Sequence, residues 1–280
     1  MPSGSHSRKT FIIFLALLYI FFIGWFVKLW INGQTEDIEN LWTNFYGIIP
    51  ILGGVYGLAV ARHWGGLKSA VGRATIFLSL GLITWGIGIA IWIFYNLVLN
   101  VEVPYPSWAD AAFIVSWPLW GIGSIYLSRA TGAKFGLKNK GGKVILLIVP
   151  VIIIALSYYF LVSVARGGTL VDFSSESFLK IFFDLAYPIG DVVILTLATL
   201  IYGLSYKYFG GKYRYAIYLI LLAFVFNYLA DFTFSYTTTV ETYYNGSLAD
   251  VLFTTTMFIF SLGIALLDIR SSQAINSKNT

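Results

Sequence analysis

Eight stretches of the chain are each long enough and apolar enough to cross a lipid bilayer, and they decide what this sequence can fold into. A helix needs roughly 20 apolar residues to span about 30 Å of hydrocarbon. With 58% hydrophobic and 11% charged residues, the chain is too apolar for a soluble globular domain. We therefore predict an all-α integral membrane protein with eight transmembrane helices. The stretches cover approximately residues 11–31, 42–60, 74–99, 108–127, 144–164, 182–204, 216–236 and 251–267.

The basic residues mark one side of the membrane. Fifteen of the 18 lysines and arginines fall in the tails and in alternate loops, whereas Lys28, Arg166 and Lys180 lie towards the other side. Cytoplasmic loops carry an excess of Lys and Arg. We therefore predict a cell-membrane protein with both termini in the cytoplasm, as an even number of spans requires. The fifteen residues are Arg8, Lys9, Arg62, Lys68, Arg73, Arg129, Lys134, Lys138, Lys140, Lys143, Lys207, Lys212, Arg214, Arg270 and Lys278.

A shift of 140 residues lays residues 105–127 over residues 245–267 without a gap, which indicates an internal repeat. Glycine pairs at 65–66 and 210–211 precede the third and seventh stretches and extend the correspondence. Since each half has four stretches, the two repeats are parallel, and a ligand site can lie between them. The alternative is that apolar sequence aligns with itself by composition alone. The matching residues are Ser107, Ala109, Asp110, Phe113, Gly123 and Leu127 with Ser247, Ala249, Asp250, Phe253, Gly263 and Leu267.

The predicted organisation has five parts. Residues 1–10 form a cytoplasmic tail, and residues 11–129 form the first four-helix repeat. A basic cytoplasmic linker at residues 130–143 leads to the second four-helix repeat at residues 144–268. Residues 269–280 form a second cytoplasmic tail.

The composition excludes several kinds of chemistry. The chain has no cysteine and two histidines, His6 in the tail and His63 in a basic loop, so no disulfide, thiolate metal site or membrane di-haem site can form. It carries no phosphate loop and no zinc motif, and we predict no cofactor and no metal. The net charge of +5 reflects the topology and favours anionic lipid headgroups as partners rather than nucleic acid.

Two S-x-x-D patterns, Ser107 to Asp110 and Ser247 to Asp250, stand where an outer loop turns into a span. In a capping box the serine oxygen accepts a backbone N–H and the acidic side chain returns to the cap, close to the positive end of the helix. We interpret these four residues as structural caps. The alternative is a direct role in ligand binding.

Asp184, Asp191 and Asp231 fall within spans, where a carboxylate is costly and must face a partner, water or the bundle interior. At 1.5 Å per residue, Asp191 lies roughly 16 Å inward from Lys180, near the middle of the membrane. Asp184 shares its helix face seven residues earlier, and Asp231 is expected at the depth of Asp184. These acids predict a polar site that opens outward, unless they form only a helix-packing network.

Polar and aromatic neighbours extend this predicted site. Tyr187 lies between the two acids of the sixth span, and Asn227 precedes Asp231 by four residues and so shares its face. Pro188 cannot donate a hydrogen bond to the carbonyl of Asp184. Lys28 is the basic residue expected to neutralise one of the acids, or else to extend to the membrane interface.

The strings PYPSWAD at residues 104–110, FDLAYPIGD at 183–191 and AD at 230–231 resemble a known module. It is the multi-span membrane sensor region found ahead of PAS, GGDEF or histidine-kinase output domains in prokaryotic signalling proteins. The resemblance covers about residues 100 to 270 and supplies no ligand. Because the sequence ends about ten residues after the last stretch, a signalling role implies a separate cytoplasmic partner.

We expect a stand-alone sensor-like or ligand-binding membrane module with an outward-facing acidic and aromatic site. The alternative is a small transporter or ion-coupled carrier that uses the acids within its spans, since such acids serve proton relays in transporters. An enzyme ranks third, because no motif points to one.

Overall fold

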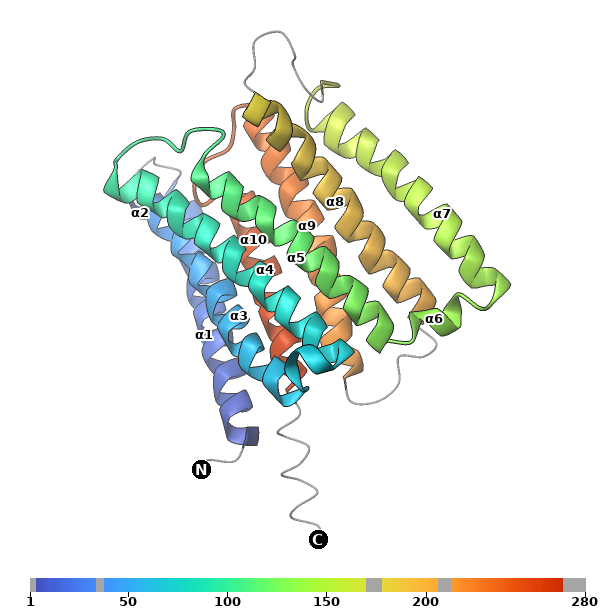
Figure 1. Cartoon of the computed structure of the whole chain (residues 1–280). Coiled ribbons are helices and arrows are strands. Elements are labelled where there is room, and N and C mark those ends of the chain that lie inside the picture. The colour runs from blue at the N-terminus through green and yellow to red at the C-terminus, as the bar shows by residue number, and fades with distance from the viewer. Residues whose placement is uncertain (1–3, 34–37, 170–177, 206–212, 269–280) are drawn as a thin grey trace.

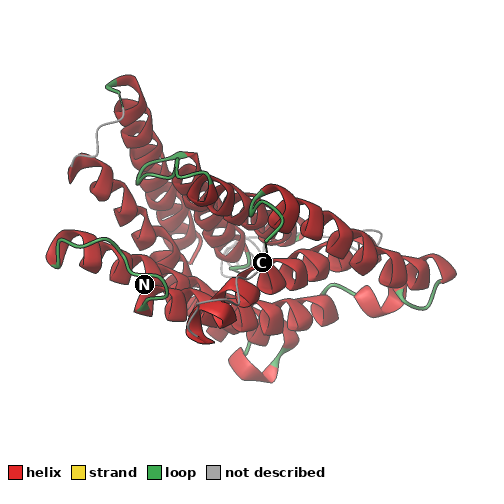
Figure 2. Cartoon of the chain, turned by 90° about the horizontal axis from the view of Figure 1, so that it is seen from above, coloured by secondary structure: helices red, strands yellow, loops and turns green. Residues whose placement is uncertain are grey.

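The computed structural model of the chain describes residues 4–33, 38–169, 178–205 and 213–268. These residues form helices joined by turns and loops, with no β-strand among them (Figures 1 and 2). In lipid, a helix satisfies its backbone N–H and C=O groups within one segment, which explains why so apolar a chain is helical. Within the described ranges, eight helical segments are long and apolar enough to cross a membrane, which confirms the predicted number.

Several spans are composites of two helical types. The second consists of the 3-10 segment η1 followed by α3, and the third and fifth end in the π-helical segments η3 and η4. The short elements α2, η2 and α6 lie between spans. The bounds are α1 Gly4–Ile31, α2 Ile38–Leu41, η1 Trp42–Gly47, α3 Ile48–His63, η2 Gly66–Lys68, α4 Ala70–Ile93, η3 Phe94–Val98, α5 Trp108–Ala130, α6 Ala133–Gly136, α7 Lys140–Ser157, η4 Tyr158–Val164, α8 Phe178–Ser205, α9 Arg214–Thr239 and α10 Leu248–Leu266.

The helices form one bundle with α1 and α7 at opposite edges (Figure 1). Helix α10 lies inside the bundle and packs against α9, α3 and α1, while α4 packs between α3 and α5. The two edge helices expose large apolar side chains such as Leu17 and Ile20 on α1 and Leu147 and Val151 on α7. Apolar residues exposed along a whole span suit contact with lipid tails.

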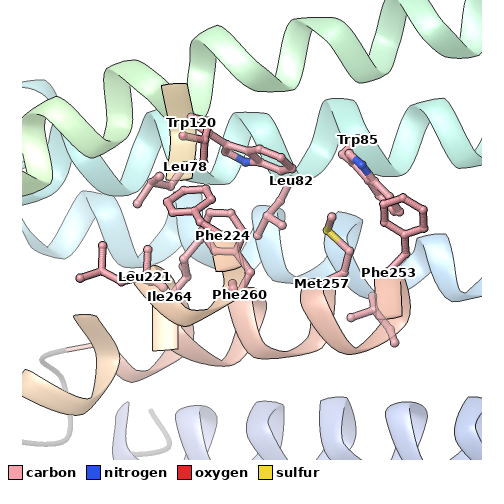
Figure 3. Close-up of a cluster of buried hydrophobic side chains, with 14 of the residues drawn as sticks. Leu78, Leu82, Trp85, Trp120, Leu221, Phe224, Phe253, Met257, Phe260 and Ile264 are labelled. Carbon is pink, nitrogen blue, oxygen red and sulfur yellow. The ribbon is translucent and has the colours of Figure 1, made fainter. Parts of the chain in front are cut away.

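The core joins the two predicted halves (Figure 3). The indole of Trp120 on α5 is fully buried, with its ring centroid 6.0 Å from Phe224 of α9 and 5.5 Å from Phe260 of α10. Gly81 on α4 faces the Trp120 ring so closely that a Cβ there would collide with it. Small residues at helix interfaces are the usual means of close packing in membranes.

One end of the bundle gathers both ends of the described chain. The guanidinium of Arg8 donates a hydrogen bond of 3.3 Å to the backbone oxygen of Asp268. The turns between α3 and α4 and between α5 and α7 lie at the same end (Figure 1). Part of the sequence prediction falls outside the described residues, namely Gly210, Gly211, Lys207, Lys212, Arg270 and Lys278.

Candidate functional site

A cavity of about 1010 Å³ lies at the end of the bundle opposite Arg8 and Asp268. Its walls come from both predicted halves of the chain: η1, α4 and α5 from the first, and η4, α8, α9 and α10 from the second. The loops at residues 99–107 and 240–247 also contribute to its lining. This cavity is lined by Asp184, Tyr187, Asp191 and Asp231. Site residues predicted on two separate spans therefore face the same cavity.

Asp191 on α8 and Asp231 on α9 form a carboxyl pair in this cavity. Their carboxyl groups lie close enough to interact with each other. The amide of Asn227 donates to Oδ2 of Asp231 at 2.5 Å. Asp191 is 3% exposed, and within the described part of the chain its Oδ1 has no hydrogen-bond partner.

In the structure Asp231 lies beside Asp191, whereas the sequence placed it at the depth of Asp184. Helix α9 continues to Thr239, beyond the predicted end of that stretch at residue 236. The added turn is stabilised locally, because the hydroxyls of Thr237 and Thr239 donate to backbone carbonyls four residues earlier. Asp231 therefore lies a turn deeper within its helix than the apolar stretch indicated.

Asp184 occupies the outer part of the cavity and has a different set of partners. The phenol of Tyr105, in the loop before α5, donates to Oδ1 of Asp184 at 2.7 Å. Burial and this hydrogen bond to a carboxylate raise the pKa of Tyr105 above its ordinary value, so the phenol remains a donor at neutral pH. The loop and α8 are thereby joined across the cavity mouth.

Arg166 is a basic residue of the cavity lining that contacts Asp184. Its Nη1 donates to the backbone oxygen of Asp184 at 2.9 Å, and its Nε donates to Oγ of Ser235 at 3.3 Å. The backbone oxygen of Asp184 is available because Pro188, four residues later, has no N–H to donate. A proline inside the helix therefore leaves one backbone carbonyl without its helical donor, and an arginine from the preceding segment donates to that carbonyl.

Asp110 caps the start of α5 and also lines the cavity. Its Oδ2 accepts from the backbone N–H of Ser107 at 2.7 Å, and the serine oxygen accepts from Ala109, which gives α5 a capping box. Its Oδ1 accepts the phenol of Tyr187 on α8 at 2.8 Å. Asp110, interpreted from sequence as structural, thus also ties α5 to the candidate site.

The second S-x-x-D pattern differs from the capping box that was expected. The hydroxyl of Ser247 makes no cap hydrogen bond and has no partner among the described residues. Asp250 instead accepts from the backbone N–H of Gly246 at 2.6 Å and from the phenol of Tyr243 at 3.3 Å. Gly246 has a positive φ of 91°, which turns its N–H towards the carboxylate. Burial and Asp250 raise the pKa of Tyr243, so it too stays protonated.

Lys28 does not line the cavity, unlike the other charged candidates. Its ammonium lies 4.7 Å from the ring centroid of Trp25 on the same helix, which fits the interfacial position considered for it. Arg166 and Lys180 are the basic side chains in the cavity lining. Sequence reasoning placed Arg166 only on the outer side, and the one signal that could have identified it is the carbonyl left open by Pro188.

Acidic side chains outnumber basic ones in the cavity lining. Among the residues that the structure describes, six acidic side chains line it against two basic ones. Aromatic side chains supply much of the remaining wall, including Tyr46, Trp85, Phe113, Trp117 and Phe253. Among the described residues, no group of three or more His, Cys, Asp or Glu side chains is arranged to hold a metal ion. The acids are Glu102, Asp110, Asp184, Asp191, Asp231 and Asp250.

Comparison of the chain with protein-family models, with characterised proteins and with solved structures finds no match.

Proposed function

We propose that this protein is a sensor-like membrane module that binds a small ligand in the cavity between its two halves. The proposal rests on one observation. A single cavity is lined by Asp184, Asp191 and Asp231 together with side chains of η1, α4 and α5. Ligand sites are typically concave and largely apolar, with a few placed polar groups, and hold some 300–1,000 Å³. A cavity of about 1010 Å³ with aromatic walls has these properties.

The cavity faces the outside of the cell membrane in this proposal. Basic residues of the predicted cytoplasmic loops, such as Arg62, Lys68, Arg129 and Lys134, lie in the last turns of α3 and α5 and in the short elements η2 and α6, at the end of the bundle away from the cavity. The excess of Lys and Arg in cytoplasmic loops supports that orientation, with both termini inside. The basic end is then the surface on which a separate signalling partner docks, as the resemblance to sensor regions implies.

The proposed parallel repeat accounts for the position of the cavity. Asp110 and Asp250 correspond under the shift of 140 residues, and both begin a span and line the cavity. Each accepts a tyrosine phenol, from Tyr187 and from Tyr243. Asp191 and Asp231, which correspond to Ile51 and Ile91, belong to the second half alone. We propose that this half supplies the specific part of the site and the first half supplies walls.

Cysteine labelling tests the orientation and the accessibility of the cavity, because the chain has no native cysteine. Thr238→Cys places a thiol in the cavity lining, and Leu67→Cys places one in η2 at the opposite end. A membrane-impermeant, cationic thiosulfonate reagent added to intact cells should modify Thr238→Cys and spare Leu67→Cys until the membrane is permeabilised. The reverse pattern would refute the proposed orientation, and no reaction of Thr238→Cys in either case would refute an accessible cavity.

The alternative function is an ion-coupled carrier, and the buried carboxyl pair of Asp191 and Asp231 favours it, since carriers use such groups to move protons. Protein reconstituted in liposomes separates the two functions. Proton or solute flux under a gradient that Asp191→Asn abolishes would establish transport. Ligand binding without flux would establish the sensor-like module.

A further inference from the structure

The acids of the cavity differ in how many hydrogen bonds their carboxyl groups already accept from the protein. Asp184 accepts from Tyr105, while Asp110 and Asp250 each accept from a phenol and from a backbone N–H. A carboxylate that accepts several hydrogen bonds is stabilised where it lies. These three acids therefore have partners within the protein.

Asp191 differs from them, because its buried Oδ1 accepts no hydrogen bond from the described residues. The carboxyl groups of Asp191 and Asp231 both line the cavity and lie close enough to interact with each other. Oδ1 of Asp191 and Oδ1 of Asn227, two buried acceptors of this cluster, have no donor among the described residues. A buried acceptor without a donor costs about 1–3 kcal/mol, so a natural occupant of the site would bring hydrogen-bond donors.

The nearest basic group is directed elsewhere. Arg166 acts electrostatically on Asp191, but its Nη1 and Nε are bonded to Asp184 and Ser235. Its charge offsets part of the negative potential of a cavity that six acids line. Acidic side chains still outnumber basic ones in the lining, and a cleft with low-dielectric walls concentrates the potential of its charges on whatever enters.

An aromatic wall stands beside the pair. Gly190 immediately precedes Asp191, and a Cβ at this glycine would lie 2.8 Å from Cδ2 of Trp117. The indole of Trp117 therefore packs directly against the helix that carries Asp191, and it lines the same cavity. Trp85 and Phe113 continue this wall, with ring centroids 5.4 Å apart. Aromatic faces attract a cation and also cover an apolar ligand body.

We propose that the ligand is a small organic cation, a primary amine with an apolar body, whose ammonium group binds the Asp191 and Asp231 carboxyl pair beside Trp117. This inference rests on the proposed ligand-binding function and names its ligand class. An ammonium supplies three donors and one positive charge, which match the open acceptor of Asp191 and the excess of acidic side chains in the cavity lining. A metal ion fits less well, because the described residues contain no group of three or more ligating side chains.

The test is the thermal stability of the detergent-purified protein with two amines and their uncharged or anionic analogues. The probes are phenethylamine and butylamine, 2-phenylethanol and butanol, and 3-phenylpropionate, with sodium chloride as an ionic control. We expect the amines alone to raise the unfolding temperature in a saturable way. Equal effects of the alcohols, of the anion or of sodium ions, or no effect of either amine, would overturn the proposal.

Variants locate the amine site. Asp191→Asn removes the charge with almost no change in shape and should weaken amine binding at least about tenfold. Asp231→Asn serves as the second variant, should the first not fold. Glu241→Gln changes an exposed acid that does not line the cavity, and it should keep the affinity within about threefold. Undiminished affinity in both folded pair variants would refute this site.

The proposed function and its ligand class fail in different ways. If Thr238→Cys is labelled from outside but the protein shows no preference for amines, the accessible cavity is supported and only the proposed ligand class is refuted. Protection of Thr238→Cys by phenethylamine, and not by 2-phenylethanol, would support both together. Failure of Thr238→Cys to react would remove the function as well as the inference.

Discussion

At the scale of single residues, the capping acid Asp110 performs two tasks with its two oxygens. Oδ2 satisfies the start of α5 through Ser107, whereas Oδ1 accepts from Tyr187 on α8. The S-x-x-D pattern predicts the first contact because it is local and repeats in many helices. The second contact depends on the distance between two helices, which no local pattern contains. A capping interpretation therefore does not exclude a role in a site.

Tyr187→Phe should lower the free energy of unfolding by about 1–3 kcal/mol, because it leaves Oδ1 of Asp110 buried without its donor. The capping box of α5 is unchanged by this substitution. Tyr236→Phe is the matched control, since Tyr236 is exposed on α9 and stacks on Phe232 through its ring. Thermal or denaturant unfolding in detergent measures both variants. Equal losses in the two would contradict a specific contact with Asp110.

At the scale of elements, α8 shows what a proline within a span can provide. Pro188 leaves the carbonyl of Asp184 without its helical donor, and this much follows from the sequence. The donor that replaces it, Arg166, comes from the turn after η4. The sequence offered Lys28 as the basic residue placed to neutralise an acid, with extension to the membrane interface as the alternative. That assignment rested on depth in the membrane, whereas the actual contact depends on how the chain folds back after η4.

A double-mutant cycle tests this link between Pro188 and Arg166. Arg166→Gln should destabilise the protein by about 1.5–3 kcal/mol, because it removes charged hydrogen bonds to Asp184 and Ser235. In a Pro188→Ala background, the restored N–H competes for the same carbonyl, so the loss should be smaller by about 1 kcal/mol. Pro150→Ala in α7 is the control proline and should combine additively with Arg166→Gln. Additivity at Pro188 as well would show that the freed carbonyl is not what holds the arginine.

At the scale of the whole molecule, the number of spans was predictable and their assembly was not. Apolar length alone identifies a span, because the bilayer sets one thickness for all of them. Helix α10 lies inside the bundle and α7 at its edge, although both are apolar along their length. The pairing of Asp191 with Asp231 joins residues 40 positions apart, and it depends on where α9 ends and how α8 packs against it. The acids of the site could be predicted because a carboxylate within the membrane is energetically costly. Their partners could be identified only from the folded structure.

The two halves should assemble from separate chains, since much of what holds them together is buried packing. A break between residues 138 and 139 leaves α6 with the first half. This half contributes Trp120, which packs against Phe224 and Phe260, and Thr131, whose hydroxyl lies 3.0 Å from that of Ser205. Co-expressed fragments 1–138 and 139–280, with a tag on one, should co-purify from detergent.

Two tryptophans of α5 make this assembly test specific. Trp120 is fully buried at the interface of the halves, whereas Trp108 on the same helix is 75% exposed. Trp120→Ala removes a buried ring, a change that costs about 3–5 kcal/mol, and it should largely abolish co-purification. Trp108→Ala should leave the yield unchanged. Fragments that insert and remain separate with the native tryptophan, or that associate equally well with Trp120→Ala, would show that the core around Trp120 is not what unites the two halves.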